Sequence, residues 1–458
     1  MADLHVPINR EIGGIAGQIA SELRDAVRHG RLASGTRLPA TRDLAADLRV
    51  SRGVVVEAYE QLVAEGFLVS RVGAGTLVAP TAAHRAEPSP GGPDRAPYYG
   101  HRPTSPDLGF FPRERWLAAV RHVLATMPGD GLDYGDPGGV PELREELAGY
   151  LRRVRAADVR PENLVVVGGV AQGLSLILRV LAGSGRIRLA VEDPGSTRQL
   201  PLLRRAGADV VRVPVDEEGL DVAALRARRA EAALVTPAHQ FPMGVVLSPA
   251  RRAALMAWAR DGDRFILEDD YDAEFRFDRD PVGCLQGLAP DRVILSGSVS
   301  KALAPGLRLG WVVAPAPVAE AVRRARGELD LGSPVVEQYA LAHFLRTGGY
   351  DKHLRRMRRE YRRRRDALVE ALAGELPEVR VRGIEAGLHV YLELPPGWDE
   401  DRVVAAALEL GLVAEPVGPM REGDGTPAVV AGFARLPARR AAETIRGLKV
   451  LMSGQKGI

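Results

Sequence analysis

The chain has 458 residues, 46% of them hydrophobic, and this length exceeds what one hydrophobic core usually holds, so we expect about two or three globular domains. The sequence has no run of about eighteen apolar residues and no signal-peptide pattern at its N-terminus, and its single cysteine, Cys284, excludes an internal disulfide framework. A cytoplasmic protein is predicted, with Cys284 as a small buried hydrophobe. The net charge of +3 is too small to predict nucleic-acid binding by itself.

Residues 1–80 predict three helices followed by a β-hairpin. Apolar residues at helical spacing predict a first helix over about residues 10–28. Thr41 and Ser51 then stand as N-caps of two shorter helices that are separated by a tight turn, which is the spacing of a helix-turn-helix. Residues 67–78 contain two short β-type runs around a glycine-rich turn, and this pattern predicts a wing.

The segment 38–78, LPATRDLAADLRVSRGVVVEAYEQLVAEGFLVSRVGAGTLV, closely resembles the winged helix of GntR-type regulators. The resemblance implies a mostly α-helical, α+β DNA-binding domain whose recognition helix points its N-terminus at the major groove. A winged helix kept for protein contacts is the alternative. Gly53 departs from the family pattern and lowers the stability of the first turn. The residues expected to contact double-stranded operator DNA are Arg42 at the backbone, Ser51 and Arg52 in the major groove, and Arg71 and Gly75 in the minor groove.

Residues 81–106 are rich in proline, glycine and alanine without an apolar period, and they predict a linker. As a coil, this linker would span about 25–30 Å on average, which lets the DNA-binding head pack against a partner chain. From there on, helices alternate with strands in the manner of a mainly parallel α/β sheet, with strands over residues 164–167, 187–191 and 232–235.

The strand over residues 164–167 leads through Gly168 and Gly169 into a helix with an apolar stripe. A helix that opens after such a turn presents free backbone amides, and these can bind a phosphate group. The same turn is common as pure structure, so it supports a phosphate site only together with other residues.

A second apolar run, residues 264–267, leads directly into acidic residues and a tyrosine. This order places Asp269 and Tyr271 at the carboxyl end of a strand, where open α/β sheets bind ligands. A carboxylate there could pair with a protonated pyridine nitrogen, and a phenol could hydrogen-bond the oxygen of the same ring. A solvated acidic loop is the alternative interpretation.

Lys301 follows a third strand-like run and a Gly/Ser-rich turn. Its amine could form a Schiff base with an aldehyde wherever the surroundings disfavour the solvated ammonium. Ser298, Ser300 and Arg308 would supply donors and a permanent positive charge for a phosphate dianion. This combination predicts pyridoxal 5'-phosphate as the cofactor, against the alternative of an ordinary surface lysine after a flexible turn.

Three motifs together resemble the large domain of class I, fold-type I aminotransferases: Asp-x-Tyr at 269–271, Ser-x-Ser-Lys at 298–301 and GLRLGW at 306–311. The wording EDDYD-x-EFR is similar to the MocR/GabR branch of the GntR regulators. This resemblance implies an α/β, fold-type I domain over residues 107–458, with a large part to about residue 340 and a smaller C-terminal α+β part from about 341. It also implies a homodimer, in a head-to-tail, domain-swapped arrangement, because fold-type I sites use residues from both subunits.

The resemblance adds residues that the spacing alone does not single out. His239 in TPAHQFPMG would lie near the cofactor ring, although a lone histidine is more often a structural hydrogen-bonder. Arg435 and His389 are the candidates for an effector site. The remaining cofactor residues would be Val170 and Ala171 at the phosphate, and Tyr134 from the other subunit.

Several positions depart from the family pattern, namely Ser196, Val140, Ala171 and Val430. Val430 stands where, by the resemblance, catalytic aminotransferases carry the arginine that binds the substrate carboxylate, and Arg435 is the candidate to substitute for it. Cofactor capture is therefore expected to persist, whereas an amino-acid substrate is poorly provided for.

The sequence predicts a transcriptional regulator that binds pyridoxal phosphate and DNA and serves vitamin B6 or amino-acid and amine metabolism. Pyridoxal phosphate itself, or an amine or amino acid, would be the small-molecule effector that shifts the placement of two DNA-binding heads. The alternatives are a working aminotransferase with Lys301 as general base, and a pure interaction scaffold. No metal and no membrane partner are expected.

A long helix is predicted from about Pro334 into the basic run Lys352–Arg365. The run would form either a solvated helix between the large and small parts or a second DNA-facing surface.

Overall fold

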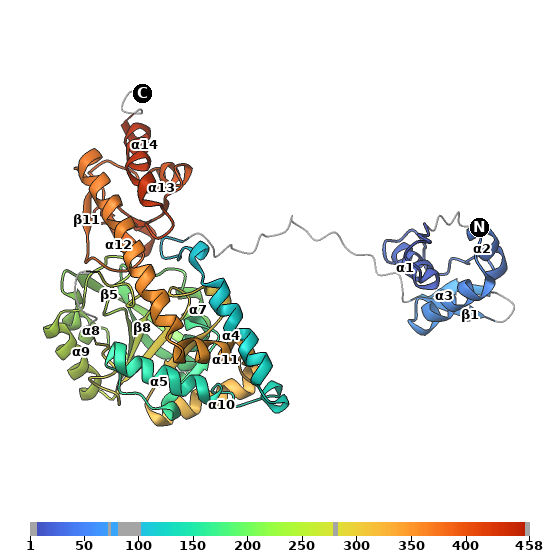
Figure 1. Cartoon of the computed structure of the whole chain (residues 1–458), viewed down its shortest axis with the longest axis horizontal. Coiled ribbons are helices and arrows are strands. Elements are labelled where there is room, and N and C mark those ends of the chain that lie inside the picture. Colours follow the sequence, from blue (N-terminus) through green and yellow to red (C-terminus); the bar gives the residue numbers. More distant parts are fainter. Residues whose placement is uncertain (1–6, 72–74, 81–101, 278–282, 454–458) are drawn as a thin grey trace. The chain divides into compact units, whose positions relative to one another are not determined.

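The computed structural model describes residues 7–71, 75–80, 102–277 and 283–453, and the chain divides into two compact units, Met1–Tyr98 and Tyr99–Ile458 (Figure 1). The predicted wing tip at 72–74 and most of the predicted linker, 81–101, lie outside the described residues. Among the helices that are described, none is long and apolar enough to cross a membrane.

The first unit is a winged helix-turn-helix built on one small core. Its helices pack buried aliphatic side chains together, and a two-stranded antiparallel hairpin closes the unit. Helix α1 begins at Ile15, five residues later than the sequence predicted, because Gly13 and Gly14 adopt positive φ angles of 73° and 64°. The elements are α1 (Ile15–Arg28), α2 (Thr41–Leu48), α3 (Arg52–Ala64), β1 (Leu68–Arg71) and β2 (Gly75–Val78).

The second unit is built around an eight-stranded sheet in the order β3-β10-β9-β8-β7-β4-β5-β6. The central pairs from β9 to β5 are parallel, whereas β10 runs antiparallel to both its neighbours and β6 runs antiparallel to β5. Every residue of β3, β7, β9 and β10 is buried, as expected of strands that are covered on both faces. The strands are β3 (Leu164–Val167), β4 (Ile187–Asp193), β5 (Ala208–Asp216), β6 (Gly219–Leu220), β7 (Ala232–Val235), β8 (Phe265–Asp270), β9 (Val293–Ser298) and β10 (Gly310–Val313).

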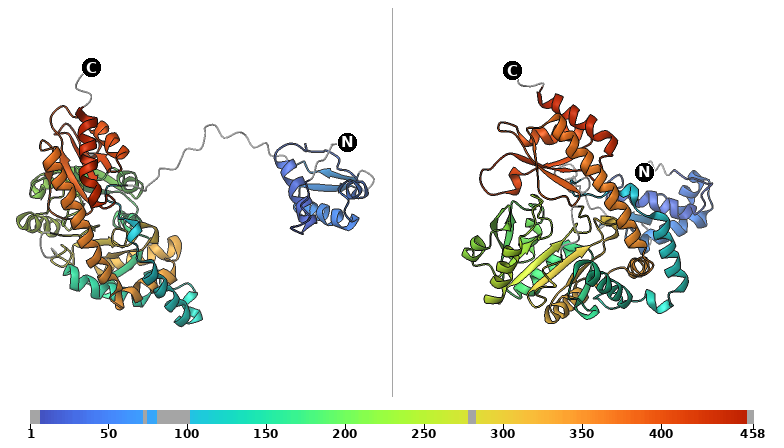
Figure 2. Two further views of the ribbon diagram at one scale, coloured as in Figure 1. Left: turned by 45° about the horizontal axis from the view of Figure 1, so that its top comes forward. Right: turned by 60° about the vertical axis from the view of Figure 1, so that its left-hand side comes forward.

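Helices cover this sheet, and a separate antiparallel sheet in the order β11-β12-β14-β13 forms the C-terminal part (Figure 2, right). Its strands are β11 (Arg380–Arg382), β12 (His389–Glu393), β13 (Val413–Pro416) and β14 (Ala428–Gly432). The helices of the unit are α4 (Arg113–Thr126), α5 (Pro141–Arg155), α6 (Val170–Ala182), α7 (Leu200–Arg205), α8 (Val222–Ala227), α9 (Pro249–Asp261), α10 (Ala316–Asp330), α11 (Val335–Arg346), α12 (Gly349–Glu375), α13 (Glu400–Glu409) and α14 (Ala441–Ser453).

The predicted long helix after residue 334 is two helices, α11 and α12. Gly348 separates them with a φ of 68°, a conformation that a helix interior does not use. Within the basic run on α12, Arg364 and Arg365 are buried and ion-paired, Arg364 with Glu360 and Arg365 with Glu385. The run is therefore only partly solvated, since one face of α12 belongs to the core.

Candidate functional site

Two of the residues that were predicted to contact DNA, Ser51 and Arg52, lie at the start of helix α3, and a third, Arg42, lies on α2. Ser51 is the N-cap residue of α3, as predicted, but its side chain makes no capping hydrogen bond. The N-cap residue of α2 is Ala40 rather than the predicted Thr41, which is the first residue of the helix. Ser51, Arg52 and Arg42 are all exposed, and Arg52 Nε donates to Thr41 Oγ1 at 3.4 Å. The hydroxyl and both guanidinium groups are thus available to an external anion.

The hairpin places the two predicted wing residues opposite each other. Arg71 on β1 is the register partner of Gly75 on β2, and both are exposed. A side chain at Gly75, which has a φ of 82°, would place a Cβ atom 3.2 Å from Nε of Arg37. Arg37 is a second cation beside the wing, and sequence reasoning missed it because it lies between the first and second predicted helices.

In the second unit, the carboxyl ends of β8 and β9 bring the predicted cofactor residues together. The strands are parallel neighbours, with Asp269 opposite Ser296. Asp269 lies within β8 rather than after it, Ser298 is the last residue of β9, and Lys301 follows three residues later. The juxtaposition follows from topology, because parallel strands end at the same edge of a sheet.

Lys301 is held in surroundings that disfavour its charge. Burial lowers the pKa of Lys301 to about 8; the carboxylate of Asp272 opposes this shift, whereas the positive charge of Arg102 adds to it. Its Nζ donates a hydrogen bond to Oγ1 of Thr104 at 3.2 Å. This amine therefore loses its proton more readily than an ordinary lysine does, which favours its action as a nucleophile.

Asp269 is a buried carboxylate with only one of its oxygens satisfied. Oδ2 accepts a hydrogen bond from Nε2 of Gln199 at 3.3 Å, whereas Oδ1 is buried and has no hydrogen-bond partner. Burial raises the pKa of Asp269 to about 6. The adjacent Asp270 is satisfied by two hydrogen bonds from Arg155, at 2.7 and 2.9 Å. Of these two carboxylates, Asp269 is the one with an oxygen that can still accept a hydrogen bond from a cationic donor.

Tyr271 and His239 meet at a second carboxylate, Asp272. His239 Nδ1 lies 2.9 Å from Asp272 Oδ2 and 3.1 Å from the Tyr271 hydroxyl. Burial raises the pKa of Tyr271 well above its usual value, so the phenol stays protonated. Gly387 packs directly against this group, since a Cβ there would lie 2.5 Å from Oδ2 of Asp272. Asp272 therefore lies where it can orient both rings, and His389 lies beyond them, tilted by 38°, with its ring centroid 5.0 Å from that of His239.

The imidazoles of His239 and His389 and the carboxylate of Asp272 also offer ligand atoms within 4.8 Å of one another, as in a metal site. The hydrogen bond between His239 and Asp272 already uses one donor and one acceptor of this trio. Because these side chains adjoin Tyr271, we assign them to a wall of the same site.

The glycine turn before α6 is closed by an arginine from the Lys301 loop. Arg308 adopts a left-handed φ of 51° and donates to the carbonyl of Gly168. Its guanidinium fills the space beside Gly169, whose φ is 97°, because a Cβ there would lie 2.9 Å from Nη2. Ser298 Oγ, in turn, accepts from the backbone amide of Ser300 at 3.3 Å. The exposed guanidinium and the first amides of α6 form a cradle for an anion.

Each of the two units matches a known protein family. Residues 15–78 match the gntR family of bacterial regulatory proteins, and residues 106–420 match the family of class I and II aminotransferases. Over 446 residues the chain is 37% identical to the HTH-type pyridoxine biosynthesis transcriptional regulator PdxR of Corynebacterium glutamicum, covering 94% of this chain and 95% of that protein. It is also 30% identical to the probable rhizopine catabolism regulatory protein MocR of Rhizobium meliloti, over 98% and 94% of the two chains.

The chain belongs to the MocR/PdxR-type family of transcriptional regulators. Its second unit has the aminotransferase fold, as predicted. An archaeal alanine:glyoxylate aminotransferase superposes with a TM-score of 0.70 at 29% identity, covering 77% of this chain and 90% of that one. The α-aminoadipate aminotransferase LysN of Thermus thermophilus superposes with a TM-score of 0.69 at 28% identity, covering 77% and 92%.

Two of the site residues predicted for this MocR/PdxR-type regulator, Tyr134 and Arg435, are exposed or hydrogen-bonded to another part of the chain. Tyr134 is 82% exposed at the surface of its own chain, and Arg435 donates from Nε to the carbonyl of Pro106 at 3.0 Å. Val170 and the exposed Ala171 open α6, where the sequence placed them.

Sequence reasoning missed Asp272 and Thr104 as neighbours of the regulator's predicted site. Asp272 had a usable signal, because it stands next to Tyr271 in the same acidic motif. Thr104 had none, since it lies in the predicted linker.

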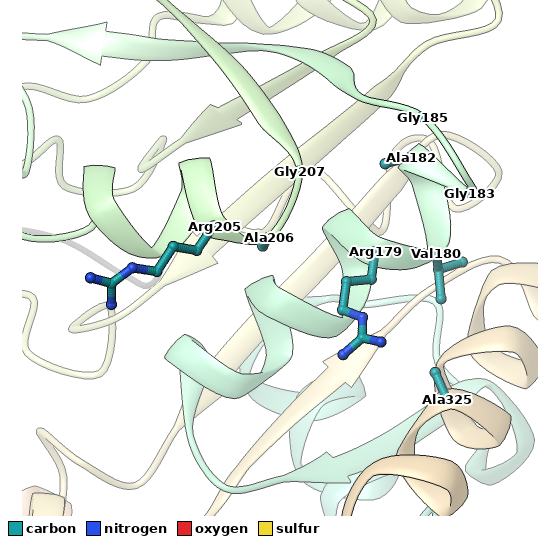
Figure 3. Close-up of a pocket in the computed structure, with 9 residues that line it drawn as sticks. All are labelled: Arg179, Val180, Ala182, Gly183, Gly185, Arg205, Ala206, Gly207 and Ala325. Carbon is teal, nitrogen blue, oxygen red and sulfur yellow. The ribbon is translucent and has the colours of Figure 1, made fainter.

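A surface pocket of about 310 Å³ lies elsewhere in the regulator, at the C-terminal ends of α6 and α7 (Figure 3). Arg179 and Arg205 are the titratable side chains that line it, and none of the predicted cofactor residues is among its walls. It therefore has no part in the site described here.

Proposed function

We propose that this transcriptional regulator binds pyridoxal 5'-phosphate at Lys301, and that occupancy of the site changes its binding to operator DNA. The observation that carries the proposal is the pairing, at two neighbouring strand ends, of a lysine whose pKa is lowered to about 8 with a buried carboxylate oxygen that lacks a partner. A cofactor with an aldehyde and a protonated ring nitrogen satisfies both groups at once.

Each residue then has a role set by its chemistry. Lys301 would hold the cofactor covalently, and Asp269 would accept a hydrogen bond from the ring nitrogen through its unfilled Oδ1. Tyr271 stays protonated and would donate to the ring oxygen, while His239 would lie against the ring. When bound, the cofactor supplies an aldehyde that condenses with amines and a conjugated ring that withdraws electrons.

The phosphate would lie at the amino end of α6. Val170 and Ala171 would offer backbone amides, and Ser298 and Ser300 would offer hydroxyl groups. Arg308 would add the permanent charge that a dianion requires, and its contact with Gly168 supports this placement.

The effector is proposed to be pyridoxal phosphate itself or an amine or amino acid. The Corynebacterium glutamicum relative is named for pyridoxine biosynthesis, which supports a role in vitamin B6 metabolism for this chain. Val430 is fully buried on β14 and provides no cation for a substrate carboxylate, so we do not favour a complete aminotransferase reaction. Arg435 and His389 remain the effector candidates.

We further propose a cytoplasmic homodimer, arranged head-to-tail with exchanged domains, in which Tyr134 reaches the partner's cofactor site. The high exposure of Tyr134 supports this role, since its ring has no place in the core of its own chain. The proposed domains are residues 1–80, 81–106 and 107–458, and the two matched families and the two compact units support this division.

Absorbance spectroscopy on the full chain tests the proposal. Mixing the wild type with pyridoxal phosphate should give a visible band that dialysis does not remove, and Lys301→Ala should lack that band. In parallel, the affinity for duplex DNA from upstream of its own gene should differ with and without the cofactor. A wild-type protein without the band would overturn the proposal.

A further inference from the structure

The segment Arg102–Asp107 is where the chain enters the second unit from the direction of the DNA-binding unit, and it lies across the proposed cofactor site. Thr104 reaches Lys301, because Lys301 Nζ donates to its Oγ1 at 3.2 Å. This contact joins residues that are 197 positions apart in the sequence.

The same segment is packed onto the C-terminal sheet. Gly432 ends β14 directly beneath it, and a Cβ at Gly432 would lie only 2.6 Å from Cα of Pro103. Arg435 holds the carbonyl of Pro106 at 3.0 Å. Positions 102–106 therefore depend on close packing on one side and on Lys301 on the other.

Asp107 is fixed independently of Lys301. Its backbone amide donates to the Tyr361 hydroxyl at 2.9 Å, and its carboxylate accepts from Arg364 Nη1 at 2.9 Å. Both partners belong to α12, and Arg364 is nearly fully buried. Asp107 is thus a firm anchor whether or not the contact at Thr104 is kept.

We propose that Thr104 is a sensing residue, which binds the free amine of Lys301 and loses this bond, loosening the segment around it, when that amine becomes engaged by the cofactor. This inference rests on the proposed function. The inference adds to the proposed function the contact through which occupancy of the cofactor site would affect the chain segment that leads to the DNA-binding unit.

Lys301 cannot donate to Thr104 and be joined to the cofactor at the same time, because both use its side-chain nitrogen. The ammonium of Lys301 carries three protons, one of which serves Thr104. Condensation with an aldehyde would replace the carbon–oxygen double bond by a carbon–nitrogen double bond, and two of those protons would leave with the carbonyl oxygen as water. The nitrogen keeps at most one proton, which the neighbouring ring oxygen accepts, so the donor for Thr104 is gone.

Loss of this bond removes one of the contacts that hold the segment, beside the packing of Pro103 on Gly432 and the bond from Arg435 to Pro106. A looser segment changes the distances that two tethered DNA-binding heads can bridge, and hence the affinity for a pair of half-sites.

The test uses full-length variants. Thr104→Val keeps the shape but removes the acceptor, Thr104→Ser restores it, and Ser105→Ala is the matched control. Ser105 is a neighbouring hydroxyl that accepts from the backbone of Arg102 at 3.0 Å, not from Lys301. The readouts are the pyridoxal phosphate affinity as a function of pH, by absorbance, and the affinity for duplex DNA from upstream of the gene, with and without pyridoxal phosphate.

We expect Thr104→Val to bind pyridoxal phosphate about tenfold more tightly, because a competing charge-assisted hydrogen bond is gone. Two changes in the pKa of Lys301 oppose each other in this variant, because loss of the Thr104 acceptor lowers it and withdrawal of the Arg102 charge raises it, so the affinities and not the pH midpoint carry the test. Without pyridoxal phosphate, this variant should bind DNA as the loaded wild type does, whereas Thr104→Ser and Ser105→Ala should follow the wild type.

Gly432→Ala provides a second route that leaves Lys301 untouched. The added methyl group displaces Pro103, and the cofactor-free protein should again bind DNA like the loaded wild type. The inference is overturned if Thr104→Val matches the wild type in pyridoxal phosphate affinity and in DNA response, or if Ser105→Ala shifts both equally. A wild type that fails to bind pyridoxal phosphate overturns the proposed function first, and this outcome is distinct.

Discussion

Replacing Lys301 by methionine should stabilise the cofactor-free protein, in a way that depends on pH. Burial lowers the pKa of Lys301 from 10.5 to about 8. A difference of about 2.5 units corresponds to at most about 3 kcal/mol at neutral pH, and the partial exposure of the side chain reduces this to about 2 kcal/mol. Methionine keeps the unbranched apolar stem and removes the charge.

The sign of the pH dependence follows from the protons bound in each state. Between about pH 8 and pH 10.5 the unfolded chain holds the lysine proton and the native chain has lost it, so wild-type stability rises with pH across this window. The advantage of Lys301→Met is therefore complete below pH 8 and vanishes above pH 10.5.

Urea unfolding at pH 7 and at pH 10.5, followed by tryptophan fluorescence, measures the difference. All four tryptophans, Trp116, Trp258, Trp311 and Trp398, lie in the second unit, so the signal reports the unit that contains Lys301. The reasoning is refuted if the variant is less stable than the wild type at pH 7, or if the gap between the two is the same at both pH values.

The other predictions concern single contacts of the two sites. Asp269→Asn should weaken pyridoxal phosphate binding about 10- to 100-fold in an absorbance titration, because the charge-assisted bond from Oδ1 is lost; unchanged affinity would remove Asp269 from the site. Gly169→Ala should cost about 1–2 kcal/mol of stability at its φ of 97° and should weaken phosphate binding by displacing Arg308, which inorganic phosphate competition would reveal. Arg52→Ala should weaken operator binding by about 1–3 kcal/mol in an anisotropy titration and leave the cofactor spectrum intact; a changed spectrum would contradict the separation of the two sites.

The sequence was sufficient to predict the meeting of Asp269 and Lys301, because both follow apolar runs that form adjacent parallel strands. Because these strands pair in parallel, residues that are far apart in the sequence meet at one edge of the sheet. The sequence motifs indicated which strands carry them. The helix-turn-helix was equally accessible, since its apolar periods and turn are local.

Other contacts had no local signal. The bond from Lys301 to Thr104 arises where a stretch rich in proline and glycine crosses a site built from distant strands, and no period or motif marks it. Similarly, the late start of α1 depends on the backbone angles of Gly13 and Gly14, which composition alone does not fix.

Borohydride reduction of the full-length protein in the presence of pyridoxal phosphate, followed by peptide mass mapping, tests the central claim most directly. The chain has only four lysines, Lys301, Lys352, Lys449 and Lys456, so each site of attachment is resolved. We predict one cofactor per chain, attached to Lys301. Attachment spread over the other three lysines, or none at all, would contradict the account.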